Sequence, residues 1–199
     1  MKPALQSQTA LAPLKETLLA QAFLLLDQKG PDGVTIRAVA RAAGVSHAAP
    51  ANHFADLKQL LTEMAWQIFE AYLAKVDACP AEDAKDRARA YLIGLYDYAQ
   101  LHPARYELLW RRDLVDWENP AFFHKLEEAY RGFLTALNLA IEPSGPGVSD
   151  VETLGTAAWS MIHGFTVMRS TGIFEERTDA VTGKPRVEAM LDLLLGAQA

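Results

Sequence analysis

Residues 35–46 have the sequence Thr-Ile-Arg-Ala-Val-Ala-Arg-Ala-Ala-Gly-Val-Ser, and this stretch decides the fold of the N-terminal part of the chain. Its apolar residues recur at helical spacing, at Ile36, Val39 and Ala40. We therefore expect a short helix that Thr35 caps and that stops at Gly44, because glycine adopts the positive φ that ends a helix at little cost.

Two further helices are expected beside this one. Residues 14–29 carry an apolar stripe before Gly30, and a third short helix is expected from Ser46, as its cap, to Phe54. Pro50 falls near the fourth position of this third helix, where it removes one backbone donor. Three short helices joined by sharp turns predict a helix-turn-helix head, whose third helix enters a DNA major groove about 12 Å wide.

The rest of the chain also has helical periodicity, and no run of alternating β-branched residues predicts a strand. A long helix should begin at Asp56, and a second should be capped by Ser149 or Asp150. Residues 142–147, Glu-Pro-Ser-Gly-Pro-Gly, form the clearest expected loop. The expected fold is all-α with about nine helices, whose remaining ranges are 81–101, 104–112, 120–141 (with Phe123, Leu126, Tyr130, Phe133 and Leu137 facing inward) and 185–195.

Charge is distributed unevenly over the 199 residues, which carry a net charge of −6. Residues 1–79 hold seven basic and seven acidic side chains and are neutral. The net negative charge therefore lies entirely in the remainder, which has twelve basic and eighteen acidic side chains. A neutral head can still bind DNA if its cations share one face, but strong non-specific binding is not expected.

The location and chemistry of the protein are also constrained by composition. The single cysteine, Cys79, fits a reducing cytosol, and the N-terminus lacks the apolar stretch of a signal peptide, so we expect a cytoplasmic protein without a membrane partner. There is no nucleophile elbow, phosphate loop or metal-ligand cluster, and no carboxylate or thiol joins His47 and His53 at ligand spacing. We expect no catalysis, no cofactor and no metal.

The stretch from Thr35 to Ser46, followed by His53-Phe54 and a long helix, resembles the DNA-binding head of the TetR family of transcriptional regulators over roughly residues 14–66. Val45–Pro50 is similar to a subgroup whose body carries a Trp-x-x-x-His-Gly signature. That signature is present at Trp159–Gly164, and Leu101-His-Pro precedes it as the subgroup leads one to expect.

The resemblance implies a head at residues 1–56 and a helical effector-binding and dimerisation body at 57–199. It implies the role of a repressor, with double-stranded DNA bound at a near-palindromic operator and released when a small-molecule effector shifts the population of two states. The side chains that would contact DNA are Thr35, Arg37, Ser46, His47, Ala48, Ala51, Asn52, His53 and Lys58. His53 is equally consistent with packing beside Phe54.

Three positions depart from the family pattern. Ala51 and Asn52 stand where members usually carry Tyr and often Arg, and Leu57 stands where members carry Lys, with Lys58 one position along. Each lost phosphate hydrogen bond is worth roughly 1–3 kcal/mol, so two could weaken binding by about tenfold to a thousandfold. An alternative function is therefore a dimeric small-molecule-binding helical module whose DNA binding is weakened or lost.

Aromatic and histidine side chains of the body predict a mostly apolar effector pocket with a few orienting polar groups. Trp159 and His163, one turn apart, form either a wall of that pocket or a tryptophan packed over a core histidine. The expected effector-binding residues are Trp66, Tyr96, His102, Tyr106, Trp110, Phe122, Trp159 and His163.

Dimerisation is assigned by the resemblance to the last two long helices, at about 149–172 and 185–196. Gly164 is expected to permit close approach of another helix, within the subunit or across a homodimer interface. The expected dimerisation residues are Leu154, Ala158, Met161, Phe165, Met168, Met190, Leu191 and Leu194.

Overall fold

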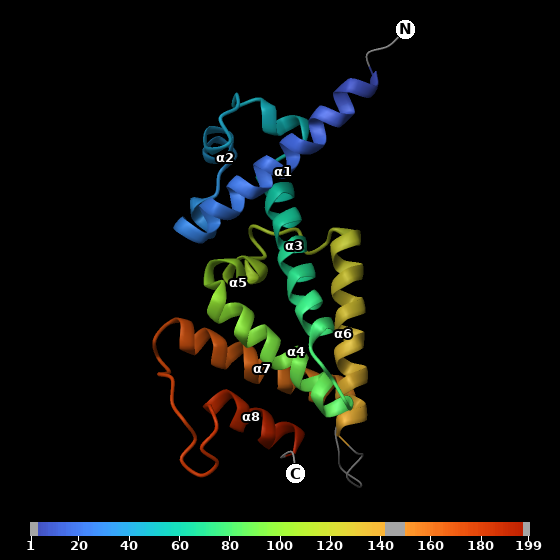
Figure 1. The fold of residues 1–199 in the computed structure, drawn as a ribbon, viewed down its shortest axis with the longest axis vertical. Helices are drawn as coiled ribbons and strands as arrows, with labels where there is room; N and C mark the ends of the chain where they lie inside the picture. The colour runs from blue at the N-terminus through green and yellow to red at the C-terminus, as the bar shows by residue number, and fades with distance from the viewer. Residues whose placement is uncertain (1–3, 142–149, 197–199) are drawn as a thin grey trace. The chain divides into compact units, whose positions relative to one another are not determined.

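The computed structural model describes residues 4–141 and 150–196, with side chains in the first helix from Pro13 onward. These residues form α-helices and two short 3-10 segments without a β-strand, which confirms the all-α fold (Figure 1). The elements are α1 (Ala4–Lys29), η1 (Pro31–Gly33), α2 (Ile36–Ala42), η2 (Ala49–Asn52), α3 (Leu57–Ala78), α4 (Ala84–Leu101), α5 (Pro103–Trp110), α6 (Pro120–Ala140), α7 (Val151–Ser170) and α8 (Arg186–Leu195).

The described residues contain eight α-helices where about nine were expected, because residues 46–54 do not form an α-helix. They form a turn followed by the 3-10 segment η2. An α-helix here would need the N–H of residue 50 to reach the carbonyl of Ser46, and Pro50 has no N–H. The expectation of an α-helical third segment is therefore wrong.

The ends of several helices follow from hydrogen bonds of their first residues. Asp150 caps α7 by accepting a bond from the Thr153 N–H at 2.8 Å, as expected. Asp56 accepts a bond from the Gln59 N–H at 2.8 Å and so caps α3. The helix α1 begins at Ala4, earlier than residue 14. The expected loop at 142–147 and the alternative cap Ser149 lie outside the described residues.

The chain divides into two compact units. The first unit consists of Met1–Phe69 together with His102–Phe122, and the second of Glu70–Leu101 together with Phe123–Ala199. The helix α3 contributes to both. The two units are defined by their compactness and not by function. The functional boundary expected between residues 56 and 57 therefore stays a prediction.

In the first unit, α1 packs on α2, and α5 packs on both α1 and η1 (Figure 1). The core contains the completely buried side chains of Leu18, Leu26, Val39, Leu60 and Met64. The segment that returns from the later part of the chain is bound by two arginine–carboxylate pairs. Arg105 contacts Asp27 through two hydrogen bonds of 2.8 and 2.6 Å, and Arg111 contacts Asp32 at 2.9 Å.

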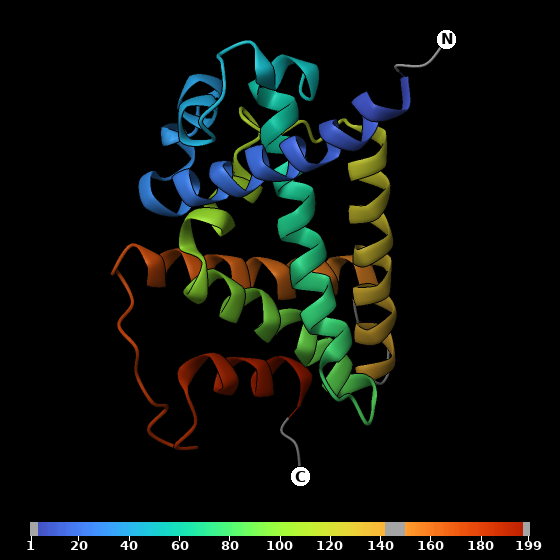
Figure 2. The ribbon, with the colours of Figure 1, turned by 45° about the horizontal axis from the view of Figure 1, so that its top comes forward.

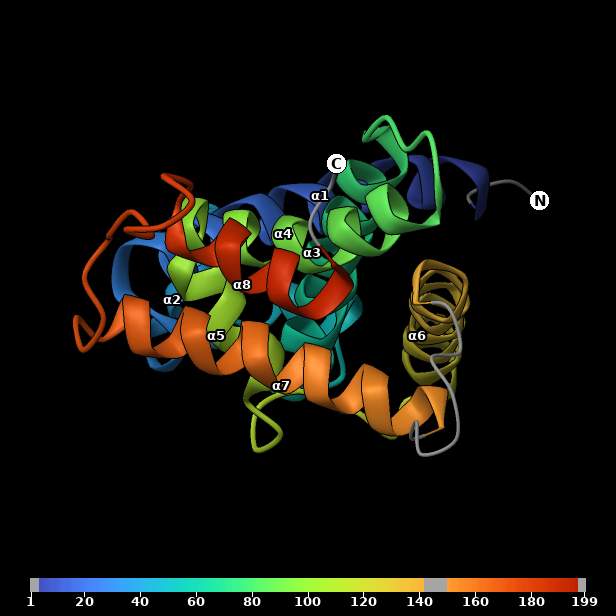
Figure 3. The ribbon, with the colours of Figure 1, turned by 90° about the horizontal axis from the view of Figure 1, so that it is seen from below.

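In the second unit, α4 packs against both α7 and α8 (Figure 2 and Figure 3). Asp192 of α8 accepts hydrogen bonds from Arg89 of α4 and, at 2.7 Å, from Lys184. These partners hold the pKa of the Asp192 carboxyl below its usual range, with the Lys184 hydrogen bond as the largest cause. The Arg89 pair therefore holds the C-terminal helix against α4.

The register of α6 differs from the expected stripe at its first turn. Phe122 is buried and Phe123 is 57% exposed, although Phe123 was expected to face inward. Eleven residues make about three helical turns, so the buried Phe133 shares its face with Phe122 rather than with Phe123. The rest of the stripe leads to Phe133 and Leu137, which are both buried as expected.

Across residues 4–141 and 150–196, no helix has the length and apolar character needed to cross a membrane.

Replacement of Gly44 tests the turn that ends α2. Gly44 has φ of 69°, so Gly44→Ala should lower the free energy of unfolding by about 1 kcal/mol, and Gly44→Asn by less, because Asn tolerates this conformation. Urea denaturation at fixed protein concentration measures the change.

Gly94→Ala serves as the control, since Gly94 lies within α4 and an added Cβ would meet Val76 at an ordinary 3.5 Å. It should leave stability unchanged or raise it by up to about 1 kcal/mol. A Gly44→Ala protein as stable as the parent would contradict the proposed strain.

Candidate DNA-binding surface and ligand clefts

The helix α2 is closed at both ends by local hydrogen bonds. Thr35 caps it by accepting a bond from the Ala38 N–H at 3.1 Å. At the other end Val45 N–H donates to the Ala40 carbonyl at 3.0 Å, and Gly44 N–H to the Arg41 carbonyl at 3.2 Å. This pair of bonds around a positive-φ glycine is a Schellman motif, so the expected roles of Thr35 and Gly44 are confirmed.

The segment after α2 is shorter than the recognition helix that was expected there, and Ser46 does not cap it. Ser46 accepts a bond from the Ala49 N–H through its carbonyl at 3.0 Å, and Ala48, not Ser46, is the residue that precedes η2. Pro50 is buried beneath the turn. The expected helix cap at Ser46 is wrong, since the segment it was to cap begins at Ala49.

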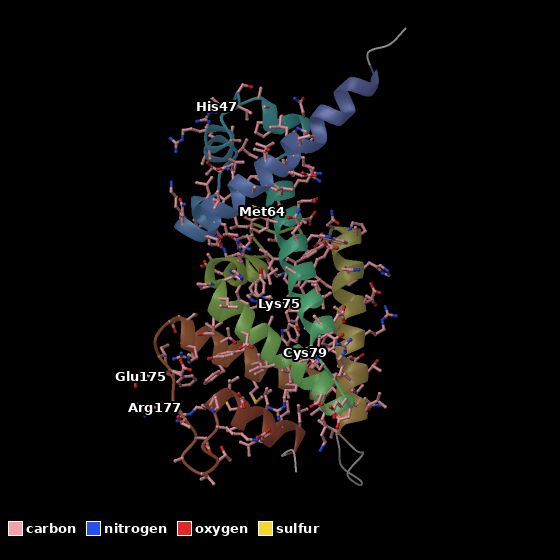
Figure 4. The ribbon with its side chains drawn as sticks, in the orientation of Figure 1. His47, Met64, Lys75, Cys79, Glu175 and Arg177 are labelled. Atoms are coloured by element: carbon pink, nitrogen blue, oxygen red, sulfur yellow. The ribbon has the colours of Figure 1, made fainter. Side chains whose placement is uncertain are left out.

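Eight of the nine side chains expected to contact DNA are exposed, and all nine belong to the first unit. They lie on α2, the turn, η2 and the first turn of α3. Figure 4 labels His47 on the turn after α2. The exposed residues are Thr35, Arg37, Ser46, His47, Ala48, Ala51, Asn52 and Lys58.

His53 is the exception. Its Nε2 atom is buried and has no hydrogen-bond partner among the described residues. Its ring centroid lies 6.4 Å from that of Phe54. This geometry supports the packing alternative, because a buried nitrogen is not accessible to a phosphate.

Lys58 stands on the first turn of α3, where its Nζ lies 4.0 Å from a carboxylate oxygen of Asp116. The helix start is fixed by Asp56 and by Gln59, whose Oε1 accepts a bond from the Ala55 N–H at 2.5 Å. This arrangement resembles a capping box, except that Gln59 accepts from the residue before the cap and not from Asp56 itself. Lys58 is half-exposed and remains able to turn toward a phosphate.

The eight residues expected to bind an effector fall into both units. The first unit holds Trp66, His102, Tyr106, Trp110 and Phe122, and the second holds Tyr96, Trp159 and His163. In the first unit a residue that the sequence did not single out joins the aromatic rings. Trp117 lies 6.0 Å from Trp110 and 6.0 Å from Phe122, and Phe122 in turn lies 6.5 Å from Trp66.

A cleft of about 560 Å³ opens beside this cluster, and we call it the α3–α6 cleft. Thr62, buried in its wall, donates a hydrogen bond to the Lys58 carbonyl at 2.8 Å and accepts one from the Asp116 N–H at 2.9 Å. Its lining includes Lys58, Thr62, Glu63, Trp66, Asp116 and Phe122. Trp66 and Phe122 were expected in a pocket; Asp116 was not, because it lies on a connection without helical periodicity.

In the second unit the three expected residues have different surroundings. Tyr96 packs on Phe165 at 5.7 Å and lines a cleft of about 220 Å³ with Arg169 and Glu188. Trp159 packs edge-on against Phe133 at 5.8 Å, away from the lining of that cleft. His163 is half-buried, and burial lowers the pKa of its imidazole, which favours the neutral form at pH 7.

The expected dimerisation residues divide by exposure. Ala158, Phe165 and Leu191 are buried within the second unit, which leaves them little surface for a partner chain. Met168 is 39% exposed. The remaining residues are half-buried: Leu154, Met161, Met190 and Leu194.

The two glycines of α7 differ in the space around them. An added Cβ at Gly155 would lie 2.3 Å from Leu134 of α6, so Gly155 is the glycine that permits a close helix approach within the unit. At Gly164 nothing among the described atoms lies within 4 Å of that position. The expectation that Gly164 admits a helix of the same subunit is therefore not supported, and its place at a homodimer interface stays a prediction.

A capped helix, a glycine-closed turn and an exposed polar segment are the parts of a helix-turn-helix head, in which a 3-10 segment here takes the place of the third helix. Comparisons with known families assign the class more narrowly. Residues 18–64 match the model of bacterial regulatory proteins of the tetR family, and residues 88–194 match a tetracycline-repressor-like C-terminal domain. The chain belongs to the TetR family.

Individual proteins resemble this chain in sequence or in fold. An HTH-type transcriptional regulator of Mycobacterium tuberculosis is 27% identical over 169 residues, which cover 84% of this chain and 75% of the relative. A structure from Rhodococcus sp. RHA1 superposes with a TM-score of 0.73 at 24% identity and covers 92% of this chain and 93% of that one. The TetR-family transcriptional regulator PfmR from Thermus thermophilus has a TM-score of 0.62 at 20% identity, covering 92% and 95%.

Substitution of Thr62 tests the contact between α3 and the segment before α6. Thr62→Val leaves the Asp116 N–H without its acceptor, so we expect a loss of about 1–3 kcal/mol of stability. Thr62→Ser keeps the hydroxyl and should lose less. Chemical denaturation followed by circular dichroism measures both variants.

Thr135→Val is the matched control. Thr135 donates a similar hydrogen bond to the Arg131 carbonyl at 2.9 Å but is exposed, so its change should stay within about 0.5 kcal/mol. If Thr62→Val and Thr135→Val lower the stability equally, the hydrogen bond from the Asp116 N–H contributes nothing to stability.

Proposed function

We propose that this TetR-family regulator is a homodimeric repressor that binds a near-palindromic operator and is released by a small-molecule effector. The observation that carries the DNA-binding half is the set of exposed side chains between residues 46 and 52, presented by a turn that Gly44 closes. Ser46, His47 and Asn52 can hydrogen-bond to base edges, and Ala48 and Ala51 can contact a thymine methyl group.

Phosphate contacts come from the flanking elements in this proposal. Arg37 and Arg41 are exposed on α2 and supply charge. The hydroxyl of Thr35 already accepts the Ala38 N–H and still has its own hydrogen to donate. Because Ala51 and Leu57 supply no phosphate hydrogen bond, we expect moderate affinity, with a salt dependence set by the few remaining cations. A protein with this role acts in the cytoplasm, where the operator is.

Dimerisation is proposed through the exposed sides of α7 and α8. Val167 and Met168 are 38% and 39% exposed on α7, next to the open position at Gly164. Leu193 is 88% exposed on α8. Large apolar side chains at this exposure favour association with a second copy, and a two-fold interface would use the same patch on both chains. Leu154, Met161, Met190 and Leu194 can add their half-buried surface to it.

The effector half of the proposal rests on the composition of the first unit. Residues 102–122 pack with the DNA-binding elements through Arg105–Asp27, Arg111–Asp32 and the Thr62 hydroxyl. A ligand that binds against this segment would therefore act on residues that are bonded to α1, η1 and α3. If it binds the released state more tightly, it lowers operator affinity by shifting the population of states.

Selection of bound duplexes from a random DNA library at about 50 mM salt tests the proposal. We expect a palindrome whose half-sites lie about 34 Å, one helical turn, apart. His47→Ala with Asn52→Ala should relax the base preference, whereas Arg37→Ala should weaken all duplexes alike and reduce the salt dependence.

Two controls establish that the protein is folded and that it is a dimer. Light scattering should give a dimer, and Val167→Glu with Leu193→Glu should give a folded monomer that no longer enriches two half-sites. No enrichment from folded, dimeric protein would contradict the repressor and favour the alternative, a ligand-binding module without DNA binding. Ala51→Tyr with Leu57→Lys would then be expected to restore binding.

A further inference from the structure

The α3–α6 cleft has the size and composition of a small-ligand site. Its volume of about 560 Å³ falls within the range of roughly 300–1,000 Å³ usual for ligand pockets. One wall is α3, with Thr62, Glu63 and Trp66, and the other is the segment from Asp116 to Phe122. All of the lining residues belong to the first unit, so the cleft is complete within it.

Its charge is negative. The lining contains the carboxylates of Asp56, Glu63 and Asp116 and one ammonium group, that of Lys58. Glu63 also pairs with Lys15 at 3.2 Å. Asp116 lies 4.0 Å from Lys58, which is beyond hydrogen-bond distance. The carboxylates therefore outnumber the neighbouring ammonium groups even when Lys15 is included, and an anion entering the cleft would meet a repulsive field.

Its apolar wall is aromatic. Trp66 and Phe122 both line the cleft, with ring centroids 6.5 Å apart, and Trp117 packs edge-on behind Phe122 at 6.0 Å. Aromatic faces attract cations because their quadrupole is negative above the ring. The cluster already holds one cation in this way: the guanidinium of Arg112 lies 5.5 Å from the Trp117 ring centroid.

We propose that the α3–α6 cleft binds a small organic cation that carries an apolar or aromatic group. The cationic nitrogen faces the carboxylates of Asp116 and Glu63, and the apolar group packs on Trp66 and Phe122. Carboxylates supply charge-assisted hydrogen bonds to an amine or amidinium, and the aromatic rings supply dispersion and cation–π attraction.

This inference deepens the proposed function, because it names the ligand class for the sensing half, and rests on that proposal only for its regulatory consequence. Asp116 connects the cleft with the helix α3. Its backbone N–H donates to the buried Thr62 hydroxyl of α3, so a ligand that engages the Asp116 side chain acts on the residue that ties the returning segment to α3. Binding to the cleft itself requires no DNA.

Calorimetric titration of the full-length protein with three probes that share one ring system tests the ligand class. The probes are 1-naphthylmethylammonium, the neutral 1-naphthalenemethanol and the anionic 1-naphthoate. We expect the cation to bind about tenfold more tightly than the alcohol, and the alcohol more tightly than the anion, because the ring is shared while the charge changes from positive through neutral to negative. Equal affinities, or a preference for naphthoate, would overturn the proposal.

Two variants locate the site. Asp116→Asn should reduce the affinity for the cation about tenfold and leave that for the alcohol unchanged, since it removes charge and keeps the shape. Trp66→Ala should weaken cation and alcohol together. Circular dichroism and the unfolding midpoint establish that each variant is folded.

Glu118→Gln is the matched control, because Glu118 lies two residues from Asp116 on the same segment, is exposed and does not line the cleft. It should bind the cation like the parent protein. If Glu118→Gln weakens binding as much as Asp116→Asn, the attraction is a general effect of charge and not of this cleft.

The two proposals fail separately. The titration uses no DNA and the duplex selection uses no ligand, so loss of cation binding with a recovered operator would reject only the cleft. Cation binding without operator enrichment would leave the cleft intact and reject the repressor.

Discussion

The end of α2 at Gly44 is the constraint on which the DNA-binding head depends. The backbone must enter the left-handed region there, with Val45 N–H bonded to the Ala40 carbonyl at 3.0 Å, and only then does the chain reverse toward η2. Since α2 has only seven residues, a shift of this stop by one position would rotate the following turn by about 100° around the helix. The exposure of Ser46, His47, Ala48, Ala51 and Asn52 therefore follows from one glycine and the threonine that fixes the opposite end of α2.

The second organising feature is the return of residues 102–122 into the first unit. This segment follows α4 of the second unit along the chain, yet Arg105, Arg111 and the Asp116 N–H bind it to α1, η1 and α3. The two arginine pairs are partly exposed, so they contribute specificity of position more than stability, whereas the Thr62 bond is buried. The same segment supplies one wall of the α3–α6 cleft, which places the proposed ligand and the DNA-binding surface in one compact body.

The sequence was sufficient for the helical class, for the cap at Thr35 and the turn at Gly44, and it narrowed the cap of α7 to Ser149 or Asp150, because each rests on local hydrogen bonding and spacing. It was not sufficient for the third helix: Pro50 was seen to remove one backbone donor, yet an α-helix was still expected across it. Trp117 and Asp116 were missed because they lie between helices, where periodicity carries no information. The burial of Ala158, Phe165 and Leu191 shows a similar limit, since an apolar face does not reveal whether it packs on its own chain or on a partner.

The central claim is that the surface formed by α2, the turn and the first turn of α3 binds DNA. Amide hydrogen exchange of the full-length protein, with and without the duplex enriched from the random library, tests it most directly. The account predicts slower exchange on DNA binding in peptides covering residues 35–58, and no comparable change in α8. Tight duplex binding with unchanged exchange at 35–58 and protection elsewhere would contradict it.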